Sequence, residues 1–268
     1  MKHWLSGVAI AATLTISGAA LAAGPAVSGL NGKLSAEAGV AGLDHQNDFA
    51  GFVSGSVTMP LGTSFGVQLD GGVGSQYGGL LASGGGHIFW RDPQQGLLGA
   101  MGQYTVADHA NWGRAGGEGE FYLNSVTLSA HAGYQFGGNG GGFKIRSGFY
   151  GGGDVVLYAT ENLSLSLGGG SYAGEWSGRG TIEFQPQFAG FSNMSIFANG
   201  EIGENNQYKA TAGVRFYFGA DKSLMRRHRE DDPEVFLFTA MGGQQKGNNP
   251  VICTLTKISG DGCGGGGE

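Results

Sequence analysis

Residues 208–218 read YKATAGVRFYF, and apolar or aromatic side chains occupy every second position from Tyr208 to Phe218. The residues between them are Lys209, Thr211, Gly213, Arg215 and Tyr217. A period of two places the two sets on opposite faces of a β-strand, whereas helical spacing would scatter the apolar residues around the axis. The stretch therefore predicts a strand with one apolar and one polar face.

The same alternation recurs along the chain, for example in FGVQLDGGV at 65–73, VTLSAHAGYQF at 126–136 and LSLSL at 163–167. Strands of about 10 to 13 residues match the length that a tilted strand needs to cross hydrocarbon. The pattern predicts twelve of them, at 31–42, 49–59, 64–73, 79–91, 97–106, 113–124, 125–136, 147–159, 163–174, 178–187, 194–203 and 207–218.

The expected fold class is all-β, a single closed antiparallel up-and-down transmembrane barrel of about twelve strands over residues 23–218. The alternative is a soluble two-sheet sandwich, whose polar faces would meet water and carry many charges. Only 13% of the residues are charged, against about a quarter in typical soluble proteins. In lipid every backbone group must pair internally, which demands closure of the sheet and favours the barrel.

The first 22 residues predict a secretory signal peptide, cleaved near Ala22. Lys2 and His3 form a short basic start, and an Ala-rich apolar stretch runs from Leu5 to Leu21. A retained membrane anchor is the alternative, but no basic stop-transfer cluster follows. Export of the chain is the expectation in either case.

The predicted connections alternate between two sets. The turns at 60–63, 91–96 and 160–162 belong to one set, and those at 43–48, 107–111 and 204–206 to the other. An even strand count puts both barrel ends of the chain on the periplasmic side, so the first set faces the periplasm and the second the exterior. The exterior loops are short for such a barrel.

The strand that ends in Phe216, Tyr217 and Phe218 resembles the final strand of bacterial outer-membrane β-barrel proteins, where an aromatic end serves as the assembly signal. The block at 221–233, DKSLMRRHREDDP, is similar to a segment that follows the barrel in alphaproteobacterial members. The resemblance covers residues 1–233. It implies a porin-like protein in the cell outer membrane, with lipid and the barrel-assembly machinery as partners and Phe216 and Phe218 as the end of the signal strand. Here 50 residues follow Phe218, which implies an internal signal strand.

Residues 219–268 are expected to form a periplasmic tail, partly disordered. Its block RRHREDD at 226–232 predicts either a solvated linker or a docking site for a periplasmic or cell-wall partner. The apolar run at 235–238 would add a strand, pack under the barrel mouth or bind a partner. Cys253 and Cys263 are candidate disulfide partners, with free thiols as the alternative.

No motif of nucleotide-binding, metalloprotease or serine-hydrolase chemistry occurs, so no catalytic residue, cofactor site or metal site is expected. A net charge of -6 gives no support to nucleic-acid binding. An outer-membrane enzyme is a remote alternative. Ser129 and His131 share a strand face, but that face points inward, whereas a nucleophile that attacks lipid should face outward.

The remaining function candidates concern the lumen. Two hypotheses compete: a narrow porin-like channel for passive diffusion of small polar solutes, and a plugged structural or interaction barrel of the cell envelope whose charges pair and fill the interior. Inward glycines such as Gly72 and Gly168 take up little volume and favour a passage. The inward set that would set selectivity is Glu37, Asp70, His87, Arg114, Glu118, Glu120, His131, Lys144, Arg146, Asp154, Arg179, Glu183, Lys209 and Arg215.

Overall fold

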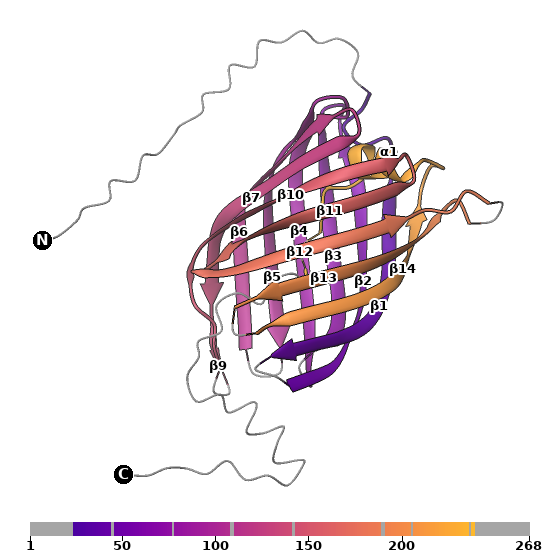
Figure 1. Cartoon of the computed structure of the whole chain (residues 1–268). Helices are drawn as coiled ribbons and strands as arrows, with labels where there is room; N and C mark the ends of the chain where they lie inside the picture. The colour runs from indigo at the N-terminus through magenta and orange to yellow at the C-terminus, as the bar shows by residue number, and fades with distance from the viewer. Residues whose placement is uncertain are drawn as a thin grey trace, which may run out of the picture.

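Twelve antiparallel strands close into one barrel in the computed structural model (Figure 1). The structure describes residues 24–43, 46–76, 78–107, 110–140, 143–188, 191–204, 206–235 and 237–238. The barrel strands are β1 (Asn31–Leu43), β2 (Gln46–Leu61), β3 (Phe65–Gln76), β4 (Gly79–Asp92), β5 (Gly96–Ala107), β6 (Ala110–Leu123), β7 (Val126–Gly137), β10 (Gly148–Thr160), β11 (Leu163–Tyr172), β12 (Glu175–Phe184), β13 (Met194–Gly203) and β14 (Tyr208–Phe218).

Each barrel strand pairs with its neighbours in the chain, and β1 pairs with β14 to close the ring. The closing register runs from Gly32 opposite Phe218 to Gly42 opposite Tyr208. A two-stranded hairpin, β8 (Asn139–Gly140) with β9 (Phe143–Lys144), lies between β7 and β10 outside the barrel sheet. One short helix, α1 (Leu224–Glu230), follows β14, and no helix of the described residues is long and apolar enough to span a bilayer.

The predicted fold class and all twelve predicted strands are confirmed, with shifts at the ends. Strand β12 is displaced as a whole, by three residues at both ends, from the predicted 178–187, and β11 ends two residues before the predicted 174. Ala173 and Gly174 have positive φ angles of 51° and 93° and form a tight two-residue turn. The chain therefore reverses two residues earlier than the alternation of side chains indicated.

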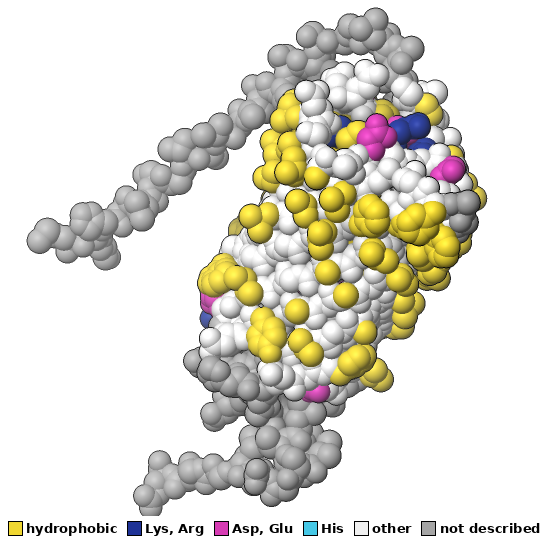
Figure 2. Space-filling model, turned by 45° about the vertical axis from the view of Figure 1, so that its right-hand side comes forward, with side chains coloured by type: hydrophobic (Ala, Val, Ile, Leu, Met, Phe, Trp, Pro, Cys, Tyr) yellow, Lys and Arg dark blue, Asp and Glu magenta, His cyan; other side chains and the backbone are white. Residues whose placement is uncertain are grey.

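The outer face of the wall is apolar. Leu34 and Val40 of β1, Val155 of β10 and Leu167 of β11 are exposed, and Leu167 reaches 74%. Figure 2 shows hydrophobic side chains spread over one side of the barrel, while the visible charged side chains lie at its two ends. In water so much exposed apolar surface would be a liability, whereas a bilayer is the solvent that suits it.

The inner face is polar, and several of its glycines mark places where side chains from flanking strands meet. Asp154 of β10 and Arg179 of β12 form an ion pair across β11 at Gly168. A Cβ at Gly168 would lie only 2.0 Å from the Asp154 Oδ1 atom. The expectation that Gly168 leaves open space is therefore wrong, because the neighbouring charged side chains occupy it.

The two ends of the barrel differ. One end, here called the α1 end, carries α1, residues 24–30 and the turns that follow β2, β4, β6, β10 and β12. The opposite end carries the hairpin of β8 and β9 and the turn at 173–174. Both ends of the barrel sequence, Asn31 and Phe218, lie at the α1 end, as the even strand count predicted.

We expect Leu167→Arg to destabilise the folded protein in lipid vesicles by about 2–4 kcal/mol, because Leu167 is the fifth of ten residues in β11 and would place a charge near the middle of the bilayer. The measurement is reversible urea unfolding in vesicles. Ser166→Arg, one residue away on the lumen face, is the matched control with the smaller loss. Equal losses for the two variants would contradict a lipid-facing side chain at position 167.

Candidate functional site

The lumen gathers most of the charged side chains that the sequence predicted to point inward. Twelve of the fourteen lie on inward positions of barrel strands and are buried or half-buried: Glu37, Asp70, His87, Arg114, Glu118, Glu120, His131, Asp154, Arg179, Glu183, Lys209 and Arg215. Arg146 is an exception, because it is exposed in the connection between β9 and β10. Lys144 lies in β9, outside the barrel sheet. The glycine-rich stretch after β7 leaves the wall as a separate hairpin, which the alternation could not show.

Charged groups of the wall pair with one another. Arg215 of β14 forms an ion pair with Glu183 of β12, and Lys209 Nζ lies 3.2 Å from a Glu201 carboxylate oxygen. The His87 ring lies between two carboxylates, 3.0 Å from Asp70 and 2.8 Å from Glu118. Together with the pair of Asp154 and Arg179, these contacts neutralise much of the wall without help from any other part of the chain.

Helix α1 sits in the barrel mouth at the α1 end. Arg227, fully buried, donates hydrogen bonds to the side-chain oxygens of Gln185 at 3.2 Å and Asn193 at 2.7 Å. Its guanidinium carbon also lies 4.7 Å from the ring centre of Tyr217. Gln185 in turn donates to the Lys222 carbonyl oxygen at 2.8 Å. This side of the helix is thus held by β14 and by the β12–β13 connection.

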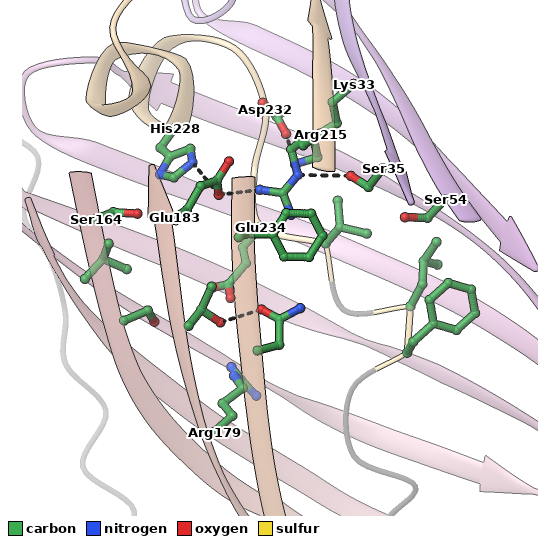
Figure 3. Close-up of a pocket in the computed structure, with 18 of the residues that line it drawn as sticks. Lys33, Ser35, Ser54, Ser164, Arg179, Glu183, Arg215, His228, Asp232 and Glu234 are labelled. Carbon is green, nitrogen blue, oxygen red and sulfur yellow. Dashed lines mark hydrogen bonds and ion pairs between the residues drawn. The ribbon is translucent and has the colours of Figure 1, made fainter. Parts of the chain in front are cut away.

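The other side of the helix reaches across the mouth. Arg229 donates to the carbonyl oxygens of Asn124 and Val126 at 2.8 and 2.9 Å, which lie at the turn between β6 and β7. His228 Nδ1 lies 3.1 Å from the Tyr158 hydroxyl. In Figure 3, the His228 ring also faces Glu183, the carboxylate that Arg215 binds from the other side. The short helix therefore bridges opposite walls of the barrel.

The N-terminal segment packs into the same mouth. Val27 is buried against Phe89 and Leu97, and the Ala26 amide donates to the Thr63 carbonyl oxygen at 2.8 Å. Ser28 donates to an Asp231 carboxylate oxygen at 3.2 Å and so joins this segment to the residues after α1. The two ends of the barrel sequence therefore close one mouth together.

Lys222 joins the N-terminal segment to the residues at the end of α1. Its ammonium group forms ion pairs with Asp231 and with Glu230, the latter at 3.2 Å, and donates to Ser28 at 2.7 Å. Burial opposes the charge of Glu230, but the hydrogen bond from Arg226 and the charge of Lys222 outweigh it and lower the pKa of Glu230 below its ordinary value. The carboxylate is therefore ionised at neutral pH and holds Lys222 in place.

Beyond α1 the chain enters the lumen itself. Asp232 forms an ion pair with Lys33, and the Pro233 carbonyl oxygen accepts a hydrogen bond from Gln68 at 3.5 Å. Ser129 donates to Glu234 at 3.4 Å. We call the described residues of 222–238 the plug, because they run through the interior of the barrel.

The last described residue of the plug packs deep in the lumen. Phe238 stacks on Phe52 with ring centres 4.8 Å apart, and its carbonyl oxygen accepts a hydrogen bond from Lys209 at 2.6 Å. A Cβ at Gly72 would lie 2.7 Å from the Phe238 ring. The small residue at position 72 thus makes room for the plug instead of leaving a passage.

A cavity of about 230 Å³ remains beside the plug, enough for several waters or one small solute. Figure 3 shows Arg179 and Glu234 together in this space, and Lys33 and Asp232 nearer the α1 end. Hydroxyl groups line much of the rest: Ser35, Ser54, Ser56, Ser164, Ser166 and Thr181. The remaining space is polar and of mixed charge.

The predicted tail is corrected in its first part. The sequence placed everything after Phe218 in the periplasm, but residues 224–235 and 237–238 lie in the mouth and the lumen. The block at 221–233 that resembles a segment after the barrel forms α1 and the entry into the lumen. Of the apolar run at 235–238, Val235, Leu237 and Phe238 line the lumen cavity, and their need for cover was the signal for this arrangement.

Three further predictions concern the end of β14, the signal peptide and the two cysteines. Phe216 and Phe218 are exposed on the outer face of β14 at the α1 end, 46% and 57% respectively, and their role as assembly signal stays a prediction. The signal peptide at 1–22 and the cysteines Cys253 and Cys263 lie outside the described residues.

Ser129 and His131 point inward, as predicted, but they have different partners. Ser129 contacts Glu234, and the His131 Nε2 atom lies 2.9 Å from the Tyr172 hydroxyl. In the described part of the chain no group of three or more His, Cys, Asp or Glu side chains is arranged to hold a metal ion.

Comparison with solved structures finds outer-membrane barrels. A KdgM porin in complex with disordered oligogalacturonate matches with a TM-score of 0.53 and 9% identity, over 70% of this chain and 99% of that chain. A further KdgM porin structure matches with a TM-score of 0.52 and 8% identity, over the same shares. No protein-family model and no curated protein matches the chain. At such identities the likeness shows the fold alone, which is that of an outer-membrane β-barrel.

We expect Arg227→Ala to loosen α1, because it removes three hydrogen bonds from a charged donor and the stacking on Tyr217. The local stability of the helix should fall by about 2–3 kcal/mol, seen as amide hydrogen exchange of residues 224–231 roughly a hundredfold faster. Arg226→Ala is the matched control, since Arg226 is exposed and pairs with Glu230 within the same helix. If both variants exchange like the parent protein, Arg227 does not hold the helix in the mouth.

Proposed function

We propose that this protein is a porin-like barrel of the bacterial outer membrane, with a narrow passage for small polar solutes that its own plug keeps closed. The apolar outer wall and the fold shared with KdgM porin support the membrane location. The α1 end faces the periplasm and the opposite end the exterior, because both ends of the barrel sequence lie at the α1 end. Outer-membrane lipid surrounds the wall, and the assembly machinery recognises β14 through Phe216 and Phe218.

The observation that carries the passage is the internal pairing of wall charges. Lys209 takes its carboxylate partner from the adjacent strand, and Arg179 and Arg215 take theirs from the next strand but one, so all three partners belong to the wall. Lys33 differs, because it pairs with Asp232 of the plug. Buried charges need partners, so a wall that pairs its own charges stays compensated when the plug leaves and water enters. Such a wall suits a passage better than a permanently filled core.

The polar lining indicates which solutes would pass. The cavity beside the plug carries Ser and Thr hydroxyls, with Glu37 and Asn199 hydrogen-bonded to each other at 2.9 Å. Groups of both charge signs and many neutral hydroxyls suit small polar solutes in general rather than one strongly charged class. The mixed lining therefore favours a diffusion passage without a dedicated binding site.

A second candidate is a barrel that stays closed and serves as a structural or interaction element of the cell envelope. The complete burial of Arg227 and Leu224 in the mouth favours it, because such contacts are typical of a permanent core. In this case the contacts of the zwitterionic block at 226–232 serve to close the barrel mouth. Under this proposal a periplasmic or cell-wall partner would bind the exposed rim around Arg226 and Asp221.

Planar-bilayer recording separates the two candidates. The parent protein should be mostly silent, and Arg227→Ala combined with Arg229→Ala should give reproducible conductance steps at least about tenfold more often, because both sides of α1 lose their hold. Arg226→Ala should behave like the parent. If every folded variant is silent, the diffusion passage is contradicted and the closed structural barrel stands.

A further inference from the structure

The outer wall of the barrel has a hollow on its apolar face. It has a volume of about 1100 Å³ and spans six strands that lie side by side, β14, β1, β2, β3, β4 and β5 (Figure 1). Pockets that bind small molecules have roughly 300–1,000 Å³. This space, here called the wall hollow, is therefore large enough for a bound molecule.

Small residues form the floor of the wall hollow. Ala38 of β1 lies opposite Ala212 of β14 on one side and opposite Gly51 of β2 on the other. Gly51 in turn lies opposite Ser75 of β3. These four positions make one row across four strands on the outer face. Because none of them carries a side chain larger than that of serine, the outer face is recessed along this row.

Large apolar side chains border this floor. Phe49 of β2, Leu80 of β4 and Val106 of β5 line the wall hollow and are exposed on the outer face. A Cβ at Gly51 would lie 2.7 Å from the Phe49 ring, so this ring leans over the floor. The wall hollow therefore offers apolar surface from below and from its sides.

The wall hollow lies in the half of the wall away from α1, and it is free of charge on its lipid side. Gly51 is the sixth of the sixteen residues of β2, and Ala82 the fourth of the fourteen of β4, counted from the opposite end. Glu37 also borders the space, but its carboxylate accepts hydrogen bonds from Asn199 and Thr211 on the lumen side. Among the described residues that line the wall hollow, no charged side chain therefore faces outward.

The shape of the wall hollow favours a flexible occupant over a second copy of this chain. In a two-fold dimer the same patch faces itself, and two hollows that face each other would leave their space unfilled. Unfilled space forfeits van der Waals contacts, and such packing is what holds apolar surfaces together in a bilayer. The wall hollow is continuous with the apolar outer wall, so acyl chains of the surrounding lipid reach it directly and can follow its shape.

We propose that the wall hollow binds the acyl chains of a membrane lipid, and that this lipid stays with the barrel when the surrounding lipid exchanges. The proposal rests on the outer-membrane location proposed above and adds a lipid-binding site to it. In the proposed orientation the site lies in the exterior leaflet. It recognises the hydrocarbon part of the lipid, because chains can lie along the row of Ala38 and Gly51 and the lining offers no outward charge for a head group.

Native mass spectrometry tests the site by counting the lipid molecules that stay bound to the full-length protein after extraction from outer membranes in mild detergent. Ala38→Phe fills the middle of the floor. Ala132→Phe is the matched control, because Ala132 is an exposed alanine on the outer face of β7, opposite Gly117 and Gly151 and outside the wall hollow. Heat-dependent electrophoretic mobility verifies that each variant is a folded barrel.

The parent protein and Ala132→Phe should retain at least one lipid on most barrels, whereas Ala38→Phe should retain about tenfold less, because its ring occupies the space of the chains. If the parent retains no lipid, or if Ala38→Phe retains as much as the parent, the lipid site is overturned while the outer-membrane location stands. If Ala38→Phe loses a bound protein instead of a lipid, the wall hollow serves a protein partner and the lipid site is overturned as well. Absence of the parent from the outer-membrane fraction would contradict the location itself, and with it the lipid site.

Discussion

Every feature of this protein depends on one constraint, that a sheet in lipid must satisfy all of its backbone hydrogen bonds within itself. The pairing of β1 with β14 meets it by removing both edges of the sheet. Once the sheet is closed, alternate side chains must face either lipid or a shared interior. That explains why Leu167 is exposed on the apolar outer face, while Arg179 on the next strand is turned inward against Asp154.

The interior that closure creates is too narrow to leave its charges unpaired. Ion pairs reach across intervening strands, as Asp154 and Arg179 do over Gly168, and aromatic rings fill the places where other glycines lie. Glycines in this lumen thus leave room for the side chains of neighbouring strands. Gly72 leaves room for the plug in the same way, since Phe238 occupies the space above it.

The plug and the wall are held by different kinds of contact, and this difference bears on function. Wall charges such as Glu183 and Arg215 pair with each other, so much of the wall is compensated without the plug, although Lys33 pairs with Asp232 of the plug. The plug relies on a concentrated set of contacts in the mouth, around Arg227 and Lys222, and on few contacts further along. The wall therefore encloses a passage whose charges are largely paired without the plug. The plug closes this passage, and substitutions in the mouth can loosen it.

The sequence by itself determined the strands, their count and which side chains face inward, because a period of two is a local property that each strand carries alone. The charge of the lumen followed from the same pattern, as Glu37 and Lys209 illustrate. Only the tertiary structure decided which charges meet, where Arg146 leaves the wall, and that Leu237 and Phe238 pack inside the lumen. These outcomes depend on residues brought together by barrel closure, such as Lys33 and Asp232, which are 199 positions apart, and no local pattern carries that information.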